Sequence, residues 1–220
     1  MSYLIRVLIP DSPGSLGRLA DAIGTVDANI VSVDVVEAFP DGTVMDDMVV
    51  DLPSGVMADS LISAAQEVEG VEVDSIRPFS GRVDRRGQIA MLASVAGEST
   101  RSRELDHLVH KIPQVLTSAW AILLDGNTER FQRVTASVAA PEESGQNPPA
   151  VRIDKARILN AESESWIPES WALLDSSLAA APLERHGLVL VVGRPGGPDF
   201  LASEVEHIGH LCQILDAVLS

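Results

Sequence analysis

Short stretches of apolar and polar residues follow two different periods along the first eighty positions. Stretches that alternate, or that are rich in β-branched residues, predict four strands, at 3–9, 29–39, 44–52 and 71–76. Apolar residues spaced i, i+3, i+4 and i+7 predict two helices, at 15–23 and 58–68. The predicted order of elements is therefore β-α-β-β-α-β.

Two turns support this order. Asp11-Ser-Pro-Gly14 follows the first strand, where Pro13 fixes φ and Gly14 permits a tight turn. Pro40-Asp-Gly-Thr43 predicts a hairpin between the second and third strands. The order is that of a split βαβ unit, with both helices on one face of an antiparallel sheet. The other face and at least one edge stay uncovered, so we expect a homodimer.

The turn and the start of the second strand resemble the ACT domain family. Asp11-Ser-Pro-Gly-Ser-Leu16 is similar to the D-x-P-G-x-L motif of that family, and Asn29-Ile30 is similar to its N-I motif. The resemblance covers about residues 3–79. It implies a ferredoxin-like regulatory module that binds an amino acid, or another small molecule, between two ACT domains. The loop after the first strand would then meet the second strand of a partner domain.

This resemblance implies a set of ligand-binding residues, namely Asp11, Ser12, Gly14, Ser15, Leu16, Asn29 and Ile30. Backbone amides of residues 14–16 would begin a helix, where the dipole favours a carboxylate. Asp11 and the Asn29 side-chain carbonyl are candidate acceptors for an ammonium group. Two other roles stay open: Asp11 or Ser12 capping the helix, and Asn29 lying in a turn.

In the second half, apolar runs predict a second set of elements. The strands are expected at 119–124, 131–139, 177–183 and 188–192, and the helices at 99–117 and from Phe200 to the C-terminus. Pro113 is expected to break or kink the first of these helices near Ile112. Residues 88–96 are compatible with a strand or a helix, 141–149 predict a loop, and 151–171 have weak periodicity.

The end of the chain resembles the GAF domain family. The features that carry the resemblance are a hairpin turn at 184–187, an apolar strand, Arg194 six residues before Phe200, and a terminal helix. It covers about residues 88–220 and implies an antiparallel-sheet domain for dimerisation or sensing. The N-K-x-F-D element of cyclic-nucleotide GAF domains is missing. Cys212 lies in the final helix rather than where a tetrapyrrole would attach, so neither ligand is implied.

Charge divides the chain at about the same place. The 220 residues carry a formal net charge of −16, and the first eighty hold fourteen acidic and three basic residues. We therefore expect a domain at 1–80, a linker at 81–87 and a domain at 88–220. Such acidity argues against nucleic acid and anionic membranes as partners. With no signal peptide and no apolar run of roughly 18 residues, we expect a cytoplasmic protein.

Few residue patterns in the sequence indicate metal binding or catalysis. His107 with His110, and His207 with His210, are each spaced i, i+3, so four imidazoles could meet at a metal. Both pairs lie off the apolar stripes, so we expect a solvated face or a dimer interface instead. Asp46-Asp47 could also attract a metal, but we expect a solvated strand edge, or charges that oppose aggregation, instead.

The remaining candidates favour structural roles. Residues 194–199 lack the lysine and spacing of a phosphate loop, and Cys212 is expected to be an inert core thiol. Trp120, Trp166 and Trp171 are expected to pack in the core. No nucleophile lies beside a base in the sequence, so we predict no catalytic residue, no metal and no cofactor.

These observations predict a two-domain α+β protein that senses a small amino acid. The amino acid would bind at an ACT dimer interface and signal to the GAF-like domain, and the chain would regulate an unknown protein in trans. An interaction protein in which both domains only dimerise is the alternative. An enzyme with a site in the GAF-like domain is a third possibility.

Overall fold

A computed structural model of the chain describes residues 1–79, 85–143, 145 and 147–219. The chain divides into two units, Met1–Arg85 (unit 1) and Arg86–Ser220 (unit 2). Within the predicted linker at 81–87, residues 81–84 lie outside the described part, whereas residues 85–87 are helical. Among the described helices, none is both long enough and apolar enough to cross a bilayer.

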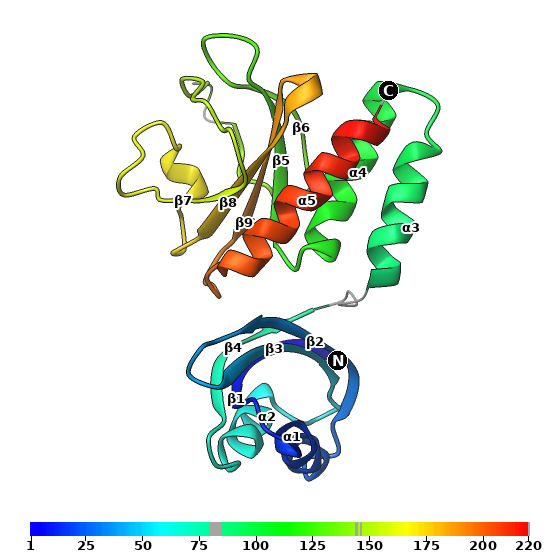
Figure 1. The fold of residues 1–220 in the computed structure, drawn as a ribbon, viewed down its shortest axis with the longest axis vertical. Helices are drawn as coiled ribbons and strands as arrows, with labels where there is room; N and C mark the ends of the chain where they lie inside the picture. Colours follow the sequence, from blue (N-terminus) through cyan, green and yellow to red (C-terminus); the bar gives the residue numbers. More distant parts are fainter. Residues whose placement is uncertain (80–84, 144, 146, 220) are drawn as a thin grey trace. The chain divides into compact units, whose positions relative to one another are not determined.

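Unit 1 is a four-stranded antiparallel sheet with two helices (Figure 1). Its elements are β1 (Ser2–Pro10), α1 (Ser15–Gly24), β2 (Asn29–Ala38), β3 (Thr43–Asp51), α2 (Ala58–Gln66) and β4 (Glu72–Pro78). This is the order that the residue pattern predicts. The strands lie side by side in the order β2-β3-β1-β4, so β2 and β4 are the two edges.

The two faces of this sheet carry different side chains because successive residues of a strand point to opposite faces. Ile5, Val7 and Ile9 of β1 form one apolar core with Leu19 of α1 and Leu61 of α2, as part of a larger buried cluster. The intervening residues of β1 point to the opposite face. There the Arg6 guanidinium makes a buried, two-pronged ion pair with Asp47, with N–O distances of 2.7 and 2.8 Å.

Unit 2 is built around a five-stranded antiparallel sheet (Figure 1). Its elements are α3 (Arg85–Ala96), α4 (Arg101–Val115), β5 (Trp120–Asp125), β6 (Gln132–Ala136), β7 (Arg157–Leu159), η1 (Glu169–Trp171), β8 (Ser177–Leu183), η2 (Glu184–His186), β9 (Leu188–Arg194) and α5 (Ala202–Val218). The strands lie in the order β6-β5-β9-β8-β7. The fold is mixed α+β, as predicted.

Apolar side chains cover both faces of this sheet. On one face, Leu123 and Val192 pack with residues of the helices, including Leu108 and Leu211. On the other face, Ile122 packs with Trp120, Trp166 and Trp171, as predicted for the tryptophans. A strand that is buried on both faces needs apolar residues at every position. This accounts for the continuous runs in β5 and β9.

In unit 2, one ambiguous segment proves to be a helix, and one predicted helix break does not occur. Residues 88–96, whose pattern is compatible with a strand or a helix, belong to α3, and only Met91 and Val95 among them are fully buried. Of the break or kink expected near Ile112, the break is wrong, since α4 continues through Pro113 to Val115. A proline removes one helical hydrogen bond. Here the following turn still closes, because Leu116 N donates to Ile112 O at 2.9 Å.

Arg194, the last residue of β9, stabilises the loop that connects β9 to α5. Its side chain is completely buried, and its guanidinium donates to Thr117 O and Pro198 O at 3.1 Å each and to Glu204 at 2.8 Å. The guanidinium also lies over the Phe200 ring, 4.1 Å from its centre. The Arg194 and Phe200 pair that suggested the GAF family therefore has a structural role, because it holds the start of α5 against the sheet.

We predict that Arg194→Met strongly destabilises unit 2. The change removes the guanidinium that donates to two buried carbonyls and to Glu204 Oε1, and the loss of such a buried charged partner typically costs about 3 kcal/mol or more. Urea unfolding followed by tryptophan fluorescence measures this, because all three tryptophans lie in unit 2. Arg152→Met is the control, since Arg152 pairs with Asp154 while 89% exposed. Equal losses in the two variants would contradict the role given to Arg194.

Candidate functional site

The loop between β1 and α1 leaves the start of α1 open. Gly14 is the N-cap residue, with φ of 90°, and no side chain among the described residues caps the helix. A residue with a Cβ is strained at this φ, which explains the glycine. The alternative role of Asp11 or Ser12 as a helix cap is therefore wrong. Ser15 N donates to the Ser12 carbonyl at 3.1 Å, whereas the amides of Leu16 and Gly17 have no side-chain cap in the described part of the chain.

Hydroxyl groups and one guanidinium organise the same loop. The Ser12 and Ser15 hydroxyls lie 2.7 Å apart, and Arg18 Nη2 donates to Ser15 Oγ at 3.1 Å. Ser15 is buried, whereas Asp11, Ser12, Gly14 and Leu16 are exposed. The sequence prediction did not include Arg18. Its i, i+3 spacing from Ser15, which puts both on one helix face, was the available signal.

Asn29 and Ile30 lie far from this loop within one chain. Asn29 pairs with Asp51, which pairs with Ser2 at the start of β1, whereas the loop follows Pro10 at the end of β1. Nine residues of strand separate these ends by roughly 25–30 Å. The predicted set of binding residues is therefore split into two groups at opposite ends of one sheet.

Asp46 and Asp47 form neither a shared metal site nor the expected solvated strand edge, because both are 2% exposed on a strand, β3, that lies between two others. They are neighbours on β3, so their side chains point to opposite faces, and Asp47 is paired with Arg6. Asp46 lies in the row of Val44 and Met48, which belong to the apolar core. It is 2% exposed, and its Oδ1 has no hydrogen-bond partner among the described residues. Burial raises the pKa of Asp46, and the charges of Asp47, Asp34 and Asp11 raise it further.

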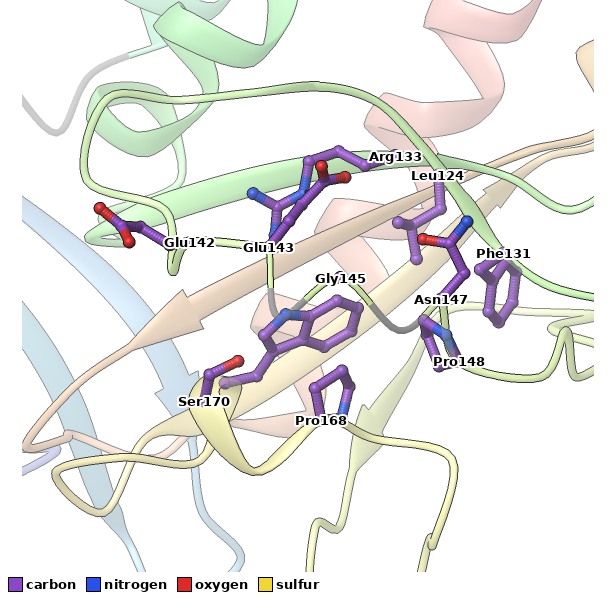
Figure 2. A pocket seen from close by; sticks show the side chains of 11 residues that line it. Leu124, Phe131, Arg133, Glu142, Glu143, Gly145, Asn147, Pro148, Pro168 and Ser170 are labelled. Atoms are coloured by element: carbon purple, nitrogen blue, oxygen red, sulfur yellow. The ribbon is translucent and has the colours of Figure 1, made fainter.

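A small pocket opens in unit 2 between the sheet and the irregular segments that precede β7 and β8. Figure 2 shows Arg133 and Leu124 on the sheet side and Glu143, Asn147 and Ser170 on the loop side. Arg133 Nε lies 3.7 Å from Glu143 Oε1, and burial lowers the pKa of Arg133. The space has a volume of about 30 Å³, enough for one or two water molecules. Small-molecule sites usually hold about 300–1,000 Å³, so this pocket fits no nucleotide as it stands.

Three of the four helical histidines, His107, His110 and His207, make separate contacts. His107 Nδ1 lies 3.0 Å from Glu98 Oε1, and its Nε2 lies 3.1 Å from Ser94 Oγ. His207 contacts the Gln88 amide instead, at 2.8 Å. Across the described residues, no three His, Cys, Asp or Glu side chains are grouped so that they could hold a metal ion. Convergence of the four imidazoles on a metal is thus not seen in this part of the chain.

Cys212 is fully buried among the apolar residues that cover the helix-facing side of the unit 2 sheet. Burial raises the pKa of its thiol to about 12, and the charge of Asp216 adds to the effect. Nucleophilic and redox chemistry of cysteine needs an accessible thiolate. Cys212 therefore has the properties of a packing residue.

Comparison with solved structures indicates the fold of unit 2. The free methionine-R-sulfoxide reductase from Neisseria meningitidis, solved with its substrate, is 13% identical, with a TM-score of 0.50, over 64% of this chain and 95% of that chain. This match extends beyond the length of unit 1, so it includes residues of unit 2. At this identity, it shows a shared fold only.

Two GAF domains also match. That of an Acinetobacter phosphoenolpyruvate-protein phosphotransferase is 15% identical, with a TM-score of 0.47, over 61% of this chain and 90% of that chain. An A. aeolicus GAF domain in an inactive state is 11% identical, with a TM-score of 0.44, over 61% and 94%. No protein-family model matches the chain, and no curated protein does.

We predict that Asp46→Asn stabilises unit 1, by about 1 kcal/mol at pH 7, because it removes a buried charge without a partner. The folded-state pKa of Asp46 is raised, so its ionisation favours unfolding. The cost appears as pH rises above the unfolded-state value, 3.8, and is absent well below it. The gain measured by calorimetric unfolding should therefore vanish near pH 3.

Asp47→Asn is the matched control, one residue along the same strand. It replaces the charged carboxylate of the buried Arg6–Asp47 ion pair with a neutral amide and should cost about 3 kcal/mol at pH 7. A loss of stability in both variants would show that Asp46 has a partner that stabilises its charge.

Proposed function

We propose that the chain is a regulatory sensor in which two copies of unit 1 bind a small amino acid between them. In this proposal unit 1 is a ferredoxin-like ACT domain. Support comes from its β-α-β-β-α-β order and from the strand order β2-β3-β1-β4. The observation that carries the proposal is the open start of α1 beside a loop that resembles the ACT motif.

The open helix start suits the carboxylate of an amino acid. Uncapped amides at a helix N-terminus bind anions, and the helix dipole adds to the attraction. The Arg18 guanidinium lies nearby, with Nη1 3.5 Å from where a Gly14 Cβ would stand. Asp11 at the start of the loop would accept from the ammonium group. The carboxylate of an amino acid would thus lie near positive groups and its ammonium group near a negative one.

Two copies are needed because Asn29 lies at the far end of the sheet. If the copies pair around a twofold axis, the loop of one can approach Asn29 and Ile30 of the other. Strand β2 is an open edge, and it exposes Val33 and Val35, with Val35 61% exposed. An exposed apolar edge strand favours pairing with a second strand. The proposed homodimer follows from this edge.

Unit 2 would receive the signal as a GAF-like domain, and the regulated protein would be a separate molecule. The ligand must bind more tightly to one arrangement of the chain than to another, since otherwise no signal results. An enzymatic role for unit 2 has less support. The pocket beside Arg133 is small, and the one thiol of the unit is buried with a pKa of about 12.

Calorimetric titration of the full chain with each of the twenty amino acids tests the proposal. We expect saturable binding of at least one small amino acid, with a dissociation constant in the micromolar to millimolar range. Asn29→Ala should weaken binding at least tenfold, since it removes an acceptor of the ammonium group. Ser63→Ala, an exposed change on α2, should leave binding unchanged.

The absence of heat and of any thermal shift with all twenty amino acids would overturn the proposal. The second candidate, an interaction protein whose units only dimerise, would then be favoured. The exposed valines of β2 support that candidate independently of any ligand.

A further inference from the structure

Helix α3 buries little apolar surface. Among residues 88–96 only Met91 and Val95 are fully buried, whereas Ile89 is 67% exposed. Most of the stability of a helix in a protein comes from packing its apolar face. Polar contacts therefore contribute a larger share to the attachment of α3 than they would to that of a fully packed helix.

Three hydrogen bonds meet around the His107 side chain, where the end of α3 lies beside α4. Ser94 Oγ donates to Met91 O at 2.8 Å, and the same oxygen lies 3.1 Å from His107 Nε2. The other ring nitrogen, Nδ1, lies 3.0 Å from Glu98 Oε1. Ser94 belongs to α3 and Glu98 follows it. The imidazole of α4 therefore joins two positions at the end of α3.

The protons available to these groups determine the charge that the arrangement requires on His107. A serine hydroxyl has one proton to donate, and an ionised carboxylate has none. Because the Ser94 proton points to Met91 O, His107 Nε2 has to donate to Ser94 Oγ. Because Glu98 only accepts, Nδ1 has to donate as well. All three bonds therefore exist together only when His107 is an imidazolium cation.

A neutral His107 cannot maintain the whole arrangement, because a neutral imidazole donates from one nitrogen only. If Nδ1 still donates to Glu98, the Ser94 hydroxyl has to turn from Met91 O to Nε2, and one of the three bonds is lost. The contact with Glu98 also changes from an ion pair to a hydrogen bond with a neutral donor, which is weaker. Loss of one proton thus weakens the connection between α3 and α4.

Other charged or titratable side chains surround His107. Those that line the same shallow hollow are Glu98, Arg103, Asp106, His110 and Lys111. Two of them are acidic and two are basic, so their formal charges cancel when the second histidine is neutral, and Glu104 adds a further acid one turn before His107. The Asp106 carboxylate accepts from Thr135 of β6 at 3.0 Å, whereas Glu98 contacts His107 directly. The charge in contact with the imidazole is therefore negative, which favours its protonation.

We propose that the attachment of α3 to α4 is pH-sensitive, with His107 as the switch. Below about pH 6.5, where an ordinary histidine takes up its second proton, the complete set of bonds holds the end of α3 against α4. As pH rises above this range the set becomes incomplete, and the end of α3 opens more often. The switch acts at the start of unit 2 and is independent of the amino-acid site in unit 1.

Hydrogen–deuterium exchange of the full chain, followed by NMR, tests this proposal. The amides of Gly97 and Glu98 report on the end of α3, because they donate to Ala93 O and Val95 O. Their protection factors, which correct for the intrinsic exchange rate at each pH, are divided by those of α5 amides, so that changes in global stability cancel. Between about pH 5.5 and about pH 8 we expect this ratio to fall at least threefold. In His107→Gln, whose side chain does not titrate, it should stay constant.

His110→Gln is the matched control. His110 is also titratable and lies one turn along α4, but its Nδ1 donates to Asp106 O within the same helix, at 2.7 Å. This variant should keep the fall of the wild-type chain, whereas Glu98→Gln, which removes the negative partner, should reduce it. A wild-type ratio that is equal at both pH values would overturn the proposal.

A fall that persists in His107→Gln would overturn the proposal as well. His207 contacts Gln88 at the other end of α3. If the fall disappears in His207→Gln but persists in His107→Gln, that contact and not His107 makes the attachment of α3 sensitive to pH.

Discussion

The antiparallel pairing of β1 with β3 places the two groups of residues that resemble the ACT motif at opposite ends of the unit 1 sheet. Because β1 runs from Ser2 to Pro10, the loop that follows it and the residue Asn29 lie at opposite ends of the sheet. No rearrangement of side chains closes a gap of roughly 25 Å. The two groups of residues that resemble the ACT motif can act on one ligand only if a second copy supplies one of them. In the proposed role, ligand binding by unit 1 therefore requires dimerisation.

Unit 2 meets a different constraint, since its sheet is buried on both sides. Helices α4 and α5 cover one face, and three tryptophans with residues of the irregular segments before β8 cover the other. Aromatic rings occupy much of the face that carries the tryptophans, and a pocket of about 30 Å³ is left there. At its border Arg133 and Glu143 lie 3.7 Å apart with opposite charges, and Glu142 lines the pocket as well. A signal that reaches unit 2 would act on this packing, and the buried Arg194 connects the packing to α5.

Much of the fold follows from residue periodicity, and the differences have physical causes. Strands of unit 1 were predictable because alternation separates an apolar face from a polar one. Residues 88–96 were ambiguous because α3 buries only Met91 and Val95 among them, too few to mark a helical stripe. The segment at 151–171 is held by tertiary contacts, such as Arg157 with Glu164, which leave no period in the sequence.

The candidate site was predictable in part. Local residue types predicted the turn at Asp11 to Gly14 and the helix after it. They did not predict that this helix lacks a side-chain cap. Alternation along a strand already places the neighbours Asp46 and Asp47 on opposite faces. The hypothesis of a shared metal site could therefore have been rejected from the sequence. That Asp46 Oδ1 lacks a partner among the described residues depends on which side chains the fold brings around it, and only the structure contains this information.

If the ligand joins two copies of unit 1, the effect of ligand on dimerisation is the most direct test of this role. A ligand that binds only between two copies must stabilise the dimer in proportion to its occupancy. Sedimentation equilibrium with the amino acid at about a hundred times its dissociation constant should show dimerisation tightened at least tenfold. The same amino acid should have no such effect on Asn29→Ala. Saturable binding that leaves the dimer constant of the wild-type chain unchanged would contradict a site shared between two copies.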